Sequence, residues 1–241
     1  MNFVIPMAGR GSRFKDAGYD SPKMLIEAKG KTLLEWSIES LPLNLCTNLV
    51  FIGLSEHNTK NRLQDFIHSK YPQLKHITRF HFLEEVSRGQ SETVLLAKHL
   101  LNTSTDLLIY NIDTMFVSSS LESKLRSGKW DGIVGAFHSE DPRYSFAKLD
   151  TGGKVIEVAE KKAISSNALT GLYHFKDPLQ FIAAAEDAIR NNETVKNEYY
   201  IAPLYNRIIA KGGNVTVDMV DEYNILGTPE ELDRFLAKNS L

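Results

Sequence analysis

One short segment near the amino terminus does most to constrain the fold of this chain. Phe3, Val4 and Ile5 form an apolar run that is followed by a loop containing Gly9 and Gly11. Such a run suits a strand that is buried on both faces. The two glycines let the backbone adopt positive φ angles and approach a ligand closely. The segment therefore predicts a strand that ends in a ligand-binding loop, as found at the carboxyl edge of an α/β sheet.

The same loop has the composition of an anion-binding site. Backbone N–H groups of a glycine-bearing loop form a concave anion site, and Arg10, Arg13 and Lys23 add positive charge. Two common phosphate loops do not fit. The dinucleotide fingerprint needs a glycine where this chain has Phe14, and the kinase-type loop needs Gly-Lys-Ser/Thr where this chain has Gly-Ser-Arg. A glycine-rich surface turn with solvated basic side chains is the alternative interpretation.

Length and composition limit the class of protein. The 241 residues are enough for one long domain, and we expect residues 1–241 to form a single catalytic domain. The net charge of −2 argues against a nucleic-acid partner held by bulk electrostatics. Cys46 is the only cysteine, so neither a disulfide framework nor a cysteine metal site is expected. The absence of a signal pattern or a long apolar run predicts a cytoplasmic protein with no membrane partner.

The order of predicted elements indicates an α/β fold. In the first half, strand patterns alternate with helical patterns, which predicts right-handed crossovers and a Rossmann-like, mostly parallel (mixed) sheet flanked by helices. The strands are expected at residues 3–5, 48–53, 77–83 and 106–112, and the helices at residues 32–41, 58–70 and 91–101. The second half is richer in strands. It is expected to form the acceptor side of the site, which would bind the molecule that receives the transferred group. Its strands are expected at residues 132–138, 145–149, 155–159, 169–175 and 215–220, and its helices at 178–190, 200–211 and from Thr228 onward.

Asp113 directly follows the apolar strand pattern of residues 106–112. Its carboxylate is therefore expected at the carboxyl edge of the sheet, near the first loop. A hard oxygen ligand at that place suits Mg²⁺ that also binds triphosphate oxygens. A strand-end aspartate that caps a turn is the alternative.

The pattern G-x-G-x-R-F, followed by Pro22-Lys23, resembles the signature of the sugar nucleotidylyltransferases, the nucleoside-diphosphate-sugar pyrophosphorylase superfamily, and the resemblance covers nearly the whole chain. It implies Mg²⁺-dependent transfer of a nucleoside monophosphate from a nucleoside triphosphate to a phosphorylated small-molecule acceptor, with release of pyrophosphate. The default acceptor is a sugar 1-phosphate, which would give an activated nucleotide sugar for surface polysaccharide synthesis. An enzyme that used phosphocholine or inositol phosphate as its acceptor would have a similar sequence pattern. The resemblance implies catalytic roles for Arg13, Lys23 and Asp113, and nucleotide binding by Ala8, Gly9, Arg10, Gly11 and Ser12.

Two further segments resemble the acceptor-binding parts of the family. Glu160-Lys161 resembles the Glu-Lys-Pro motif, in which the acid contacts the sugar and the lysine its phosphate, although Lys162 replaces the proline. The segment 167–173 resembles the one that follows, in which a glycine, here Gly171, lets the backbone approach the acceptor. Glu198 precedes a tyrosine pair and is a further candidate for the acceptor pocket. A solvated hairpin edge and tyrosine core packing are the alternatives.

Gly89, Gln90 and Glu92 lie in a segment that resembles the base-reading loop of the family. A glutamate accepts hydrogen bonds only, which suits the exocyclic amine of cytosine better than a carbonyl of uracil or thymine. CTP is therefore slightly favoured, with UTP, dTTP and GTP possible. An ordinary acid in the first turn of a helix is the competing interpretation of Glu92.

The chain departs from the family pattern at one position. Many members have a second metal-binding aspartate two residues before the glycine of a Gly-Thr-Pro segment, where this chain has Ile225. Asp218, Asp221 and Glu222 are the substitutes considered, and Asp221 is the first choice. Surface acids are the alternative, in which case substrate oxygens and water would complete the coordination of Mg²⁺.

Two other functional classes stay open. A glycosyltransferase that binds a nucleotide sugar would use residues 111–113 as a degenerate metal motif, but it needs no cationic loop for a γ-phosphate. A non-catalytic nucleotide-sensing module is suggested by Ile225. Turnover without dependence on pyrophosphate would favour the first, and tight nucleotide binding without turnover would favour the second.

Overall fold

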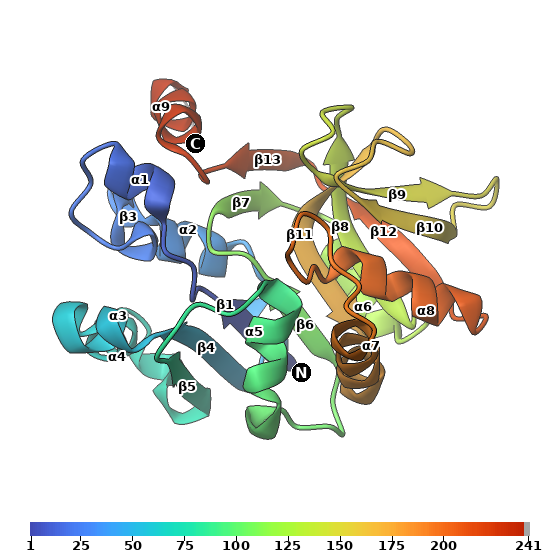
Figure 1. Ribbon diagram of the computed structural model, residues 1–241, viewed down its shortest axis with the longest axis horizontal. Coiled ribbons are helices and arrows are strands. Elements are labelled where there is room, and N and C mark those ends of the chain that lie inside the picture. Colours follow the sequence, from blue (N-terminus) through green and yellow to red (C-terminus); the bar gives the residue numbers. More distant parts are fainter. Residues whose placement is uncertain (239–241) are drawn as a thin grey trace.

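The computed structural model describes residues 1–238, and nine strands of this part form one large sheet (Figure 1). The strand order β10-β9-β11-β6-β1-β4-β5 runs across the sheet, and β8 and β12 continue it beside β11. The strands are β1 (Asn2–Pro6), β4 (Asn48–Leu54), β5 (Thr78–Leu83), β6 (Leu107–Tyr110), β8 (Gly132–His138), β9 (Ser145–Leu149), β10 (Val155–Glu160), β11 (Asn167–Phe175) and β12 (Val215–Met219).

Strand directions divide the sheet into two halves. β1 lies between β4 and β6 and is parallel to both, and β5 continues this parallel half beyond β4. β11 is antiparallel to β6 and joins the first half to the second, where it also pairs with β8 and β9. β12 is parallel to β8, and β10 is antiparallel to β9. The predicted α/β class with a mixed, mostly parallel central sheet is therefore confirmed.

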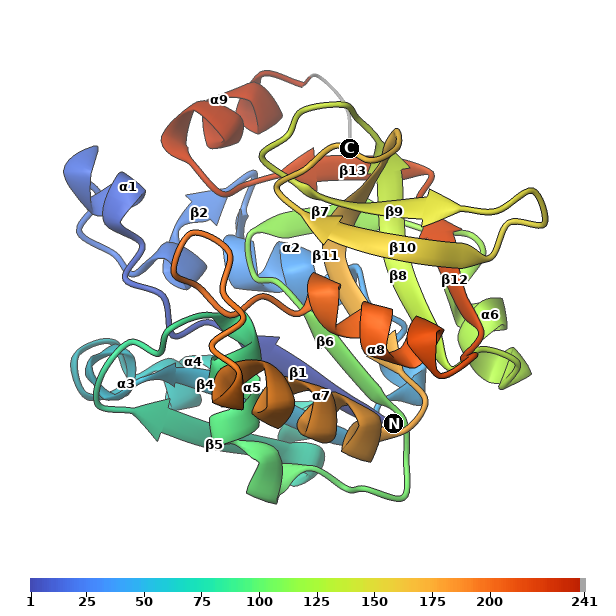
Figure 2. The ribbon, with the colours of Figure 1, turned by 45° about the vertical axis from the view of Figure 1, so that its right-hand side comes forward.

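Helices cover both faces of the sheet because its central strands are apolar on both sides. Val4 faces one buried cluster, whereas Phe3 and Ile5 face another, as the two-residue period of a strand requires. The first face is covered by α5 (Gln90–Leu96), α7 (Pro178–Arg190) and α8 (Tyr205–Ala210), which lie in front of the sheet in Figure 2. The second face is covered by α2 (Leu33–Glu39), α4 (Leu63–Lys70) and α6 (Leu121–Ser127).

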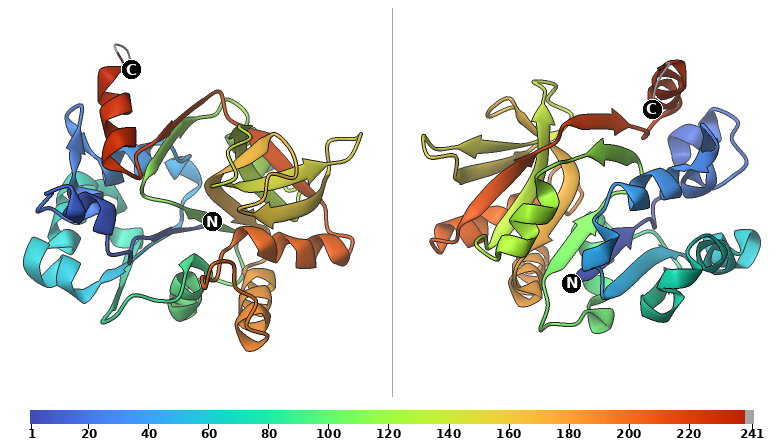
Figure 3. Two further views of the ribbon diagram at one scale, coloured as in Figure 1. Left: turned by 45° about the horizontal axis from the view of Figure 1, so that its top comes forward. Right: turned by 180° about the vertical axis from the view of Figure 1, so that it is seen from behind.

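A third buried cluster lies above the carboxyl edge of β1. Here α9 (Pro229–Ala237) lies beside α1 (Ser12–Asp16), as both views of Figure 3 show, and Phe14 shares the cluster with Leu232 and Phe235. The small pair β2 (Glu27–Ala28) and β3 (Lys31–Thr32) completes this region. β13 (Glu222–Ile225) pairs antiparallel with β7 (Thr114–Val117) and leads the chain back to the first half. The last helix is thereby placed over the glycine loop.

Several element boundaries differ from the expectations. The helix expected at residues 58–70 is two helices, α3 (Ser55–Asn61) and α4, separated by Arg62 in the left-handed region with φ of 50°. The helix expected to end at residue 101 stops at Leu96, and the one expected from residue 200 begins at Tyr205. β7, β13 and α6 were not predicted. None of the helices within residues 1–238 has the length and apolar character needed to span a membrane.

Candidate active site

The loop after β1 is shaped by Gly11. This residue has φ of 61° and precedes the first turn of α1, and a Cβ atom there would lie 3.2 Å from Cβ of Lys23. A side chain at this position would therefore be strained and crowded. Gly9 and Arg10 are exposed, whereas Ala8 is buried beneath them. Ser12 and Arg13 are exposed on α1. The predicted nucleotide loop thus presents its backbone and its arginines at the surface.

Lys23 connects this loop to the end of β6. It follows Pro22 in a short 3₁₀ turn, and its Nζ atom lies 2.7 Å from Oδ2 of Asp113. The two side chains are 18% and 30% exposed, so the pair is partly screened from water while remaining accessible. The structure therefore brings together two of the three predicted catalytic residues, which are separated by 90 positions in the sequence.

A second carboxylate lies close to Asp113. The backbone N–H of Leu226 donates to the carbonyl of Asp113 at 2.7 Å, which holds the start of the Gly-Thr-Pro segment against the end of β6. A Cβ atom at Gly227 would lie 3.3 Å from Oδ2 of Asp113 and 3.1 Å from Oε2 of Glu231. The two carboxylate oxygens are therefore no farther apart than these distances combined. Because residue 227 is glycine, no side chain lies between the two oxygens.

Glu231 is fixed from three directions. Its backbone N–H donates to Oγ1 of Thr228 at 3.2 Å, its Oε2 accepts from the backbone N–H of Gly227 at 3.1 Å, and its Oε1 lies 2.7 Å from Nη1 of Arg143. Its relative exposure is only 6%. Arg143 comes from the loop between β8 and β9, so this ion pair links α9 to the second half of the sheet. A cavity of about 260 Å³ adjoins it and is lined in part by Tyr223 and Ile225.

Arg13, the third predicted catalytic residue, is exposed on α1, which packs against α9 through Phe14. The pKa of Glu230 is lowered mainly by hydrogen bonds with its own backbone and with Thr228, and the nearby positive charge of Arg13 contributes. The helix that carries Arg13 thus lies beside α9, whereas Lys23 contacts Asp113 at the end of β6.

The predicted base-reading loop is packed against the segment that precedes α8. Gly89 has φ of 139°, and a Cβ atom there would lie 2.5 Å from the backbone N and O atoms of Tyr199. Only glycine fits this approach. The side-chain amide of Gln90 donates to Oδ1 of Asn111 at the end of β6. A Cβ atom at Gly171 would lie 2.2 Å from Nδ2 of the same Asn111. Gln90 and Gly171 thus meet at Asn111, two residues from Asp113.

Glu92 is engaged within its own loop. Its carboxylate accepts from the backbone N–H of Arg88 at 2.6 Å and forms an ion pair with the guanidinium of Arg88 at 2.6 Å. Burial alone would raise the pKa of Glu92, but these hydrogen bonds outweigh it and the pKa is lowered. Glu92 is thus an acid in the first turn of α5, as the competing interpretation of the sequence expected. Recognition of a base by Glu92 stays a prediction.

The predicted acceptor residues lie at the end of β10 and in the segment before α8. The Glu160 carboxylate accepts a hydrogen bond from Ser145, and the Lys161 ammonium contacts the hydroxyl of Tyr200 and lies 4.4 Å from the centre of its ring. Burial raises the pKa of Glu160, the hydrogen bond from Ser145 and the charge of Lys161 oppose this, and the Glu198 carboxylate adds to it. Glu160, Lys161 and Glu198 therefore share one electrostatic environment.

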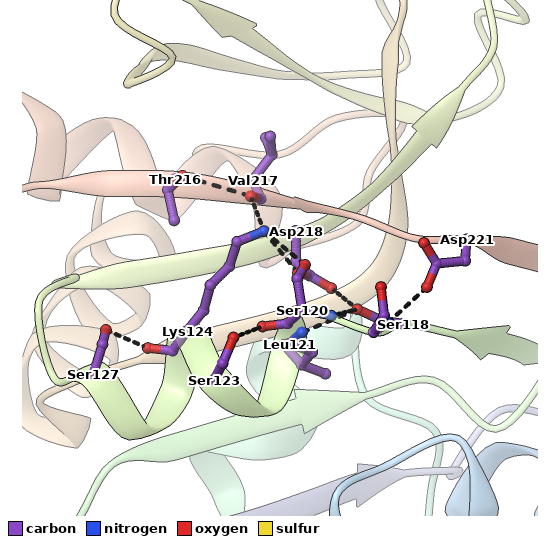
Figure 4. Close-up of polar contacts among 11 residues, drawn as sticks. Ser118, Ser120, Leu121, Ser123, Lys124, Ser127, Thr216, Val217, Asp218 and Asp221 are labelled. Carbon is purple, nitrogen blue, oxygen red and sulfur yellow. Dashed lines mark hydrogen bonds and ion pairs between the residues drawn. The ribbon is translucent and has the colours of Figure 1, made fainter.

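Asp221, the predicted second metal ligand, makes its contacts away from Asp113. Its backbone N–H donates to the carbonyl of Val117, at the opposite end of the β7–β13 pair from Asp113, and its carboxylate accepts from the backbone N–H of Ser119 at 2.7 Å. At about 3.3 Å per strand residue, Asp221 lies about 13 Å along the strand from Ile225. Figure 4 shows its side chain directed at the segment before α6.

Asp218, the second substitute considered, is also occupied. It is fully buried and lies 2.8 Å from Nζ of Lys124. The hydroxyls of Ser118 and Ser120 donate to its two oxygens at 2.7 and 2.6 Å, as Figure 4 shows. This network joins α6 to β12 and holds the Asp218 carboxylate at that place, away from Asp113. Glu222 accepts from the side chain of Asn224.

Sequence reasoning did not identify Glu231 or Arg143 as site residues, and it considered Asn111 only within the glycosyltransferase alternative. Glu231 was visible only as an acid in the first turn of the last helix. The direction of the Glu231 side chain depends on its hydrogen bond with Gly227 and on its ion pair with Arg143, which lies 88 positions away in the sequence. Asn111 precedes Asp113 by two residues, and its contacts with Gln90 and Gly171 follow from strand pairing that the sequence does not display.

Comparison with known proteins identifies the family. Residues 3–222 match the family described as nucleotidyl transferase. Among solved structures, a nucleoside-diphosphate-sugar pyrophosphorylase from Vibrio cholerae RC9 is 35% identical, with a TM-score of 0.83 over 98% of this chain and 100% of that one. The inositol-1-phosphate CTP transferase from T. maritima shares the fold, with a TM-score of 0.73 at 13% identity over 100% and 97% of the two chains.

Curated relatives are more distant and longer. The bifunctional protein GlmU of Thermoanaerobacter pseudethanolicus is 23% identical over 98% of this chain and 50% of its own length. The corresponding protein of Thermotoga sp. strain RQ2 is 26% identical over 86% and 44%. The chain thus spans about half the length of the curated relatives it matches. The family match, the fold and the motifs agree: the chain belongs to the nucleotidyl transferase family, within the superfamily of sugar nucleotidylyltransferases.

Proposed function

We propose that this chain transfers a nucleoside monophosphate from a nucleoside triphosphate to a phosphorylated small molecule and releases pyrophosphate. The contact between Lys23 and Asp113 is the observation that carries the proposal, because it places a cation and a metal-binding type of oxygen at the end of a glycine loop. The default acceptor is a sugar 1-phosphate, and CTP is the slightly favoured donor. A role in surface polysaccharide synthesis would follow from a sugar acceptor.

The residues present suit Mg²⁺. Asp113 offers a hard oxygen of the kind this ion prefers, and Gly227 places no side chain beside that oxygen. Within residues 1–238 no group of three or more His, Cys, Asp or Glu side chains is placed to hold a metal. This agrees with an ion that takes few protein ligands and keeps waters and substrate phosphate oxygens. Bound Mg²⁺ would supply charge neutralisation of the triphosphate.

In the proposed reaction, an oxygen of the acceptor phosphate attacks the α-phosphorus in line. The bond between the α-phosphorus and the bridging β-oxygen breaks, and its electron pair leaves with pyrophosphate. Such a transfer depends on positioning and charge neutralisation more than on covalent work by the protein. Arg13 would hold the β- and γ-phosphates. Lys23 keeps donors free beyond its contact with Asp113, since an ammonium has three N–H groups, and would neutralise the α-phosphate.

On the acceptor side, Lys161 would bind the acceptor phosphate, with Tyr200 holding its ammonium in place. Glu160, Glu198 and the backbone at Gly171 would contact the remainder of the acceptor. The loop containing Gly89 and Gln90 would face the nucleotide base.

A thermal-stability screen with Mg²⁺ and each of ATP, CTP, GTP, UTP and dTTP tests the donor site first. A ligand at about a hundred times its Kd stabilises the fold by about 2.7 kcal/mol, which raises the Tm measurably. The donor found in this way then enters a pyrophosphate-release assay with a panel of sugar 1-phosphates, phosphocholine and inositol phosphate. Pyrophosphate release that requires one acceptor is the expected result, and the absence of both stabilisation and release would refute the proposal.

One observation favours a second candidate, a nucleotide-sensing module without turnover. Ile225 lies beside the end of β6, where many members of the superfamily have a metal-binding aspartate. The same experiment separates the two functions. A sensing module would be stabilised by one triphosphate and would release no pyrophosphate with any acceptor.

A further inference from the structure

We infer that Glu231 is the second carboxylate of the divalent-cation site and acts together with Asp113 in place of the residue that Ile225 replaces. The inference rests on the proposed function, because that function supplies the cation. It assigns to Glu231 a role that its place in the first turn of a helix does not by itself suggest.

The direction of the Glu231 side chain is the first argument. An acid in the first turn of an exposed helix ordinarily reaches back to the helix N-terminus or into water. Glu231 does reach back, since its Oε2 accepts from the N–H of Gly227 at 3.1 Å. It is nevertheless only 6% exposed, and the same oxygen lies on the side of Gly227 that Oδ2 of Asp113 also borders. Glu230, the preceding residue, has an exposed side chain.

The absence of a side chain at Gly227 is the second argument. Its φ lies outside the left-handed region, so backbone conformation does not require glycine here. A methyl group would lie 3.1 and 3.3 Å from the two carboxylate oxygens, closer than ordinary van der Waals contact. Glycine therefore keeps a small space between two oxygens that a cation or a metal-bound water would occupy.

Electrostatic balance is the third argument. Asp113 has Lys23 as its cationic partner, and Glu231 has Arg143. Arg143 holds Oε1 and so fixes the orientation of the carboxylate, while Oε2 has one neutral donor, the N–H of Gly227 at 3.1 Å. A carboxylate has about four lone-pair sites, so Oε2 keeps capacity for a cation or for its water. Arg143 is thus a positioning residue for Glu231.

The test measures metal binding directly. Mn²⁺ is titrated against the full chain, alone and with each of the five triphosphates, and free Mn²⁺ is followed by electron paramagnetic resonance. Glu231→Gln should weaken Mn²⁺ binding by about 10–100-fold, as the loss of ligands or of their hydrogen-bonded partners generally does. Glu230→Gln removes the same charge one residue away and is the matched control, which should keep the wild-type affinity. Asp113→Asn should lose binding.

Two further variants keep the result interpretable if Glu231→Gln disturbs α9. Gly227→Ala places a methyl group between the carboxylates and should also weaken Mn²⁺ binding, with the circular dichroism spectrum unchanged. Ile225→Asp, added to Glu231→Gln, introduces an acid on the strand beside Asp113 and should restore affinity.

The outcomes separate this inference from the proposed function. Loss of Mn²⁺ affinity in Glu231→Gln, recovered by Ile225→Asp, supports the inference even if no acceptor gives turnover. Wild-type affinity in both Glu231→Gln and Gly227→Ala overturns it, even if the protein releases pyrophosphate. A wild-type chain that binds no Mn²⁺, alone or with any of the triphosphates, overturns it as well.

Discussion

The ammonium of Lys23 and the carboxylate of Asp113 are in contact at 2.7 Å, although one follows the glycine loop and the other follows β6. The parallel pairing of β1 with β6 brings the ends of both strands to the same edge of the sheet. The contact therefore follows from topology, and it places a cation where a nucleotide phosphate and a metal would meet.

Replacement of Lys23 by alanine tests its part in the reaction. The variant should lose turnover by about 10²–10³-fold, the usual effect of removing one group that stabilises transition-state charge. Nucleotide affinity should change much less, since the other phosphate contacts remain. Lys15→Ala, which removes an exposed lysine from α1, is the control and should leave kcat unchanged. An unaltered kcat in Lys23→Ala would rule out this role.

Gly171→Ala tests how closely β11 approaches Asn111. Gly171 has φ of 88° at an irregular register in β11, and an added Cβ would lie 2.2 Å from Nδ2 of Asn111. Gly153 has φ of 83° with no atom within 4 Å of such a Cβ, so it provides a matched control.

Alanine at Gly153 should lower the free energy of unfolding by about 1 kcal/mol, the cost of a left-handed conformation. Alanine at Gly171 should cost about 1–3 kcal/mol more because of the clash. Urea denaturation of both variants measures the difference. Equal losses would mean that the site accommodates the methyl group.

The buried contact between Asp218 and Lys124 predicts a large effect on stability. Asp218→Ala removes a fully buried carboxylate and leaves the ammonium without its partner, so the free energy of unfolding should fall by about 3–5 kcal/mol. Asp221→Ala removes only a cap-like hydrogen bond with the N–H of Ser119 and should cost about 1 kcal/mol. Mn²⁺ affinity should be unchanged in Asp221→Ala. A loss of Mn²⁺ affinity in this variant would show that Asp221 is part of the metal site.

Glu160 should make stability depend on pH. Burial raises its pKa in the folded state above the ordinary value of about 4.3, although the hydrogen bond from Ser145 and the charge of Lys161 oppose this. The folded state therefore binds more protons than the unfolded state between these two pKa values, and stability falls as pH rises through that window. Below the unfolded pKa Glu160 adds no penalty, and above the folded pKa the penalty is constant.

Removal of this carboxylate checks the sign. The free energy of unfolding of Glu160→Gln, minus that of the wild type, should increase as pH rises from 4 and then become constant. Glu157→Gln, which removes an exposed carboxylate from the same strand, is the control. A difference that decreases with rising pH would show that Glu160 is stabilised in its charged form.

The central strands and the loop after β1 were predictable because their signals are local. The apolar run at Phe3–Ile5 fits a doubly buried strand, and Gly11 marks the left-handed turn that follows it. Thr228, Pro229 and the acids after them predict the start of α9 for the same reason, since capping depends on neighbours along the chain. The approach of Lys23 to Asp113 was predictable too, because parallel strands bring their carboxyl ends to one edge.

The choice of the second metal ligand depended on contacts between residues that are far apart in the sequence, so local signals were not enough for it. Asp221 was the first choice for the second metal ligand, yet an extended strand places it about 13 Å from Ile225. Glu231 comes after the same segment, and the first turn of a helix brings it back over Gly227. Nearness in sequence therefore does not show which of the two acids approaches Asp113.

The sequence by itself determined the family, most of the order of strands and helices, and the cationic loop, because each depends on residue types at short spacing. Only the tertiary structure decided which carboxylate stands beside Asp113. That outcome depends on the pairing of β7 with β13, the space left by Gly227, and an arginine on the opposite half of the sheet. These contacts join residues that are far apart along the chain, and side-chain direction at such contacts is set by packing.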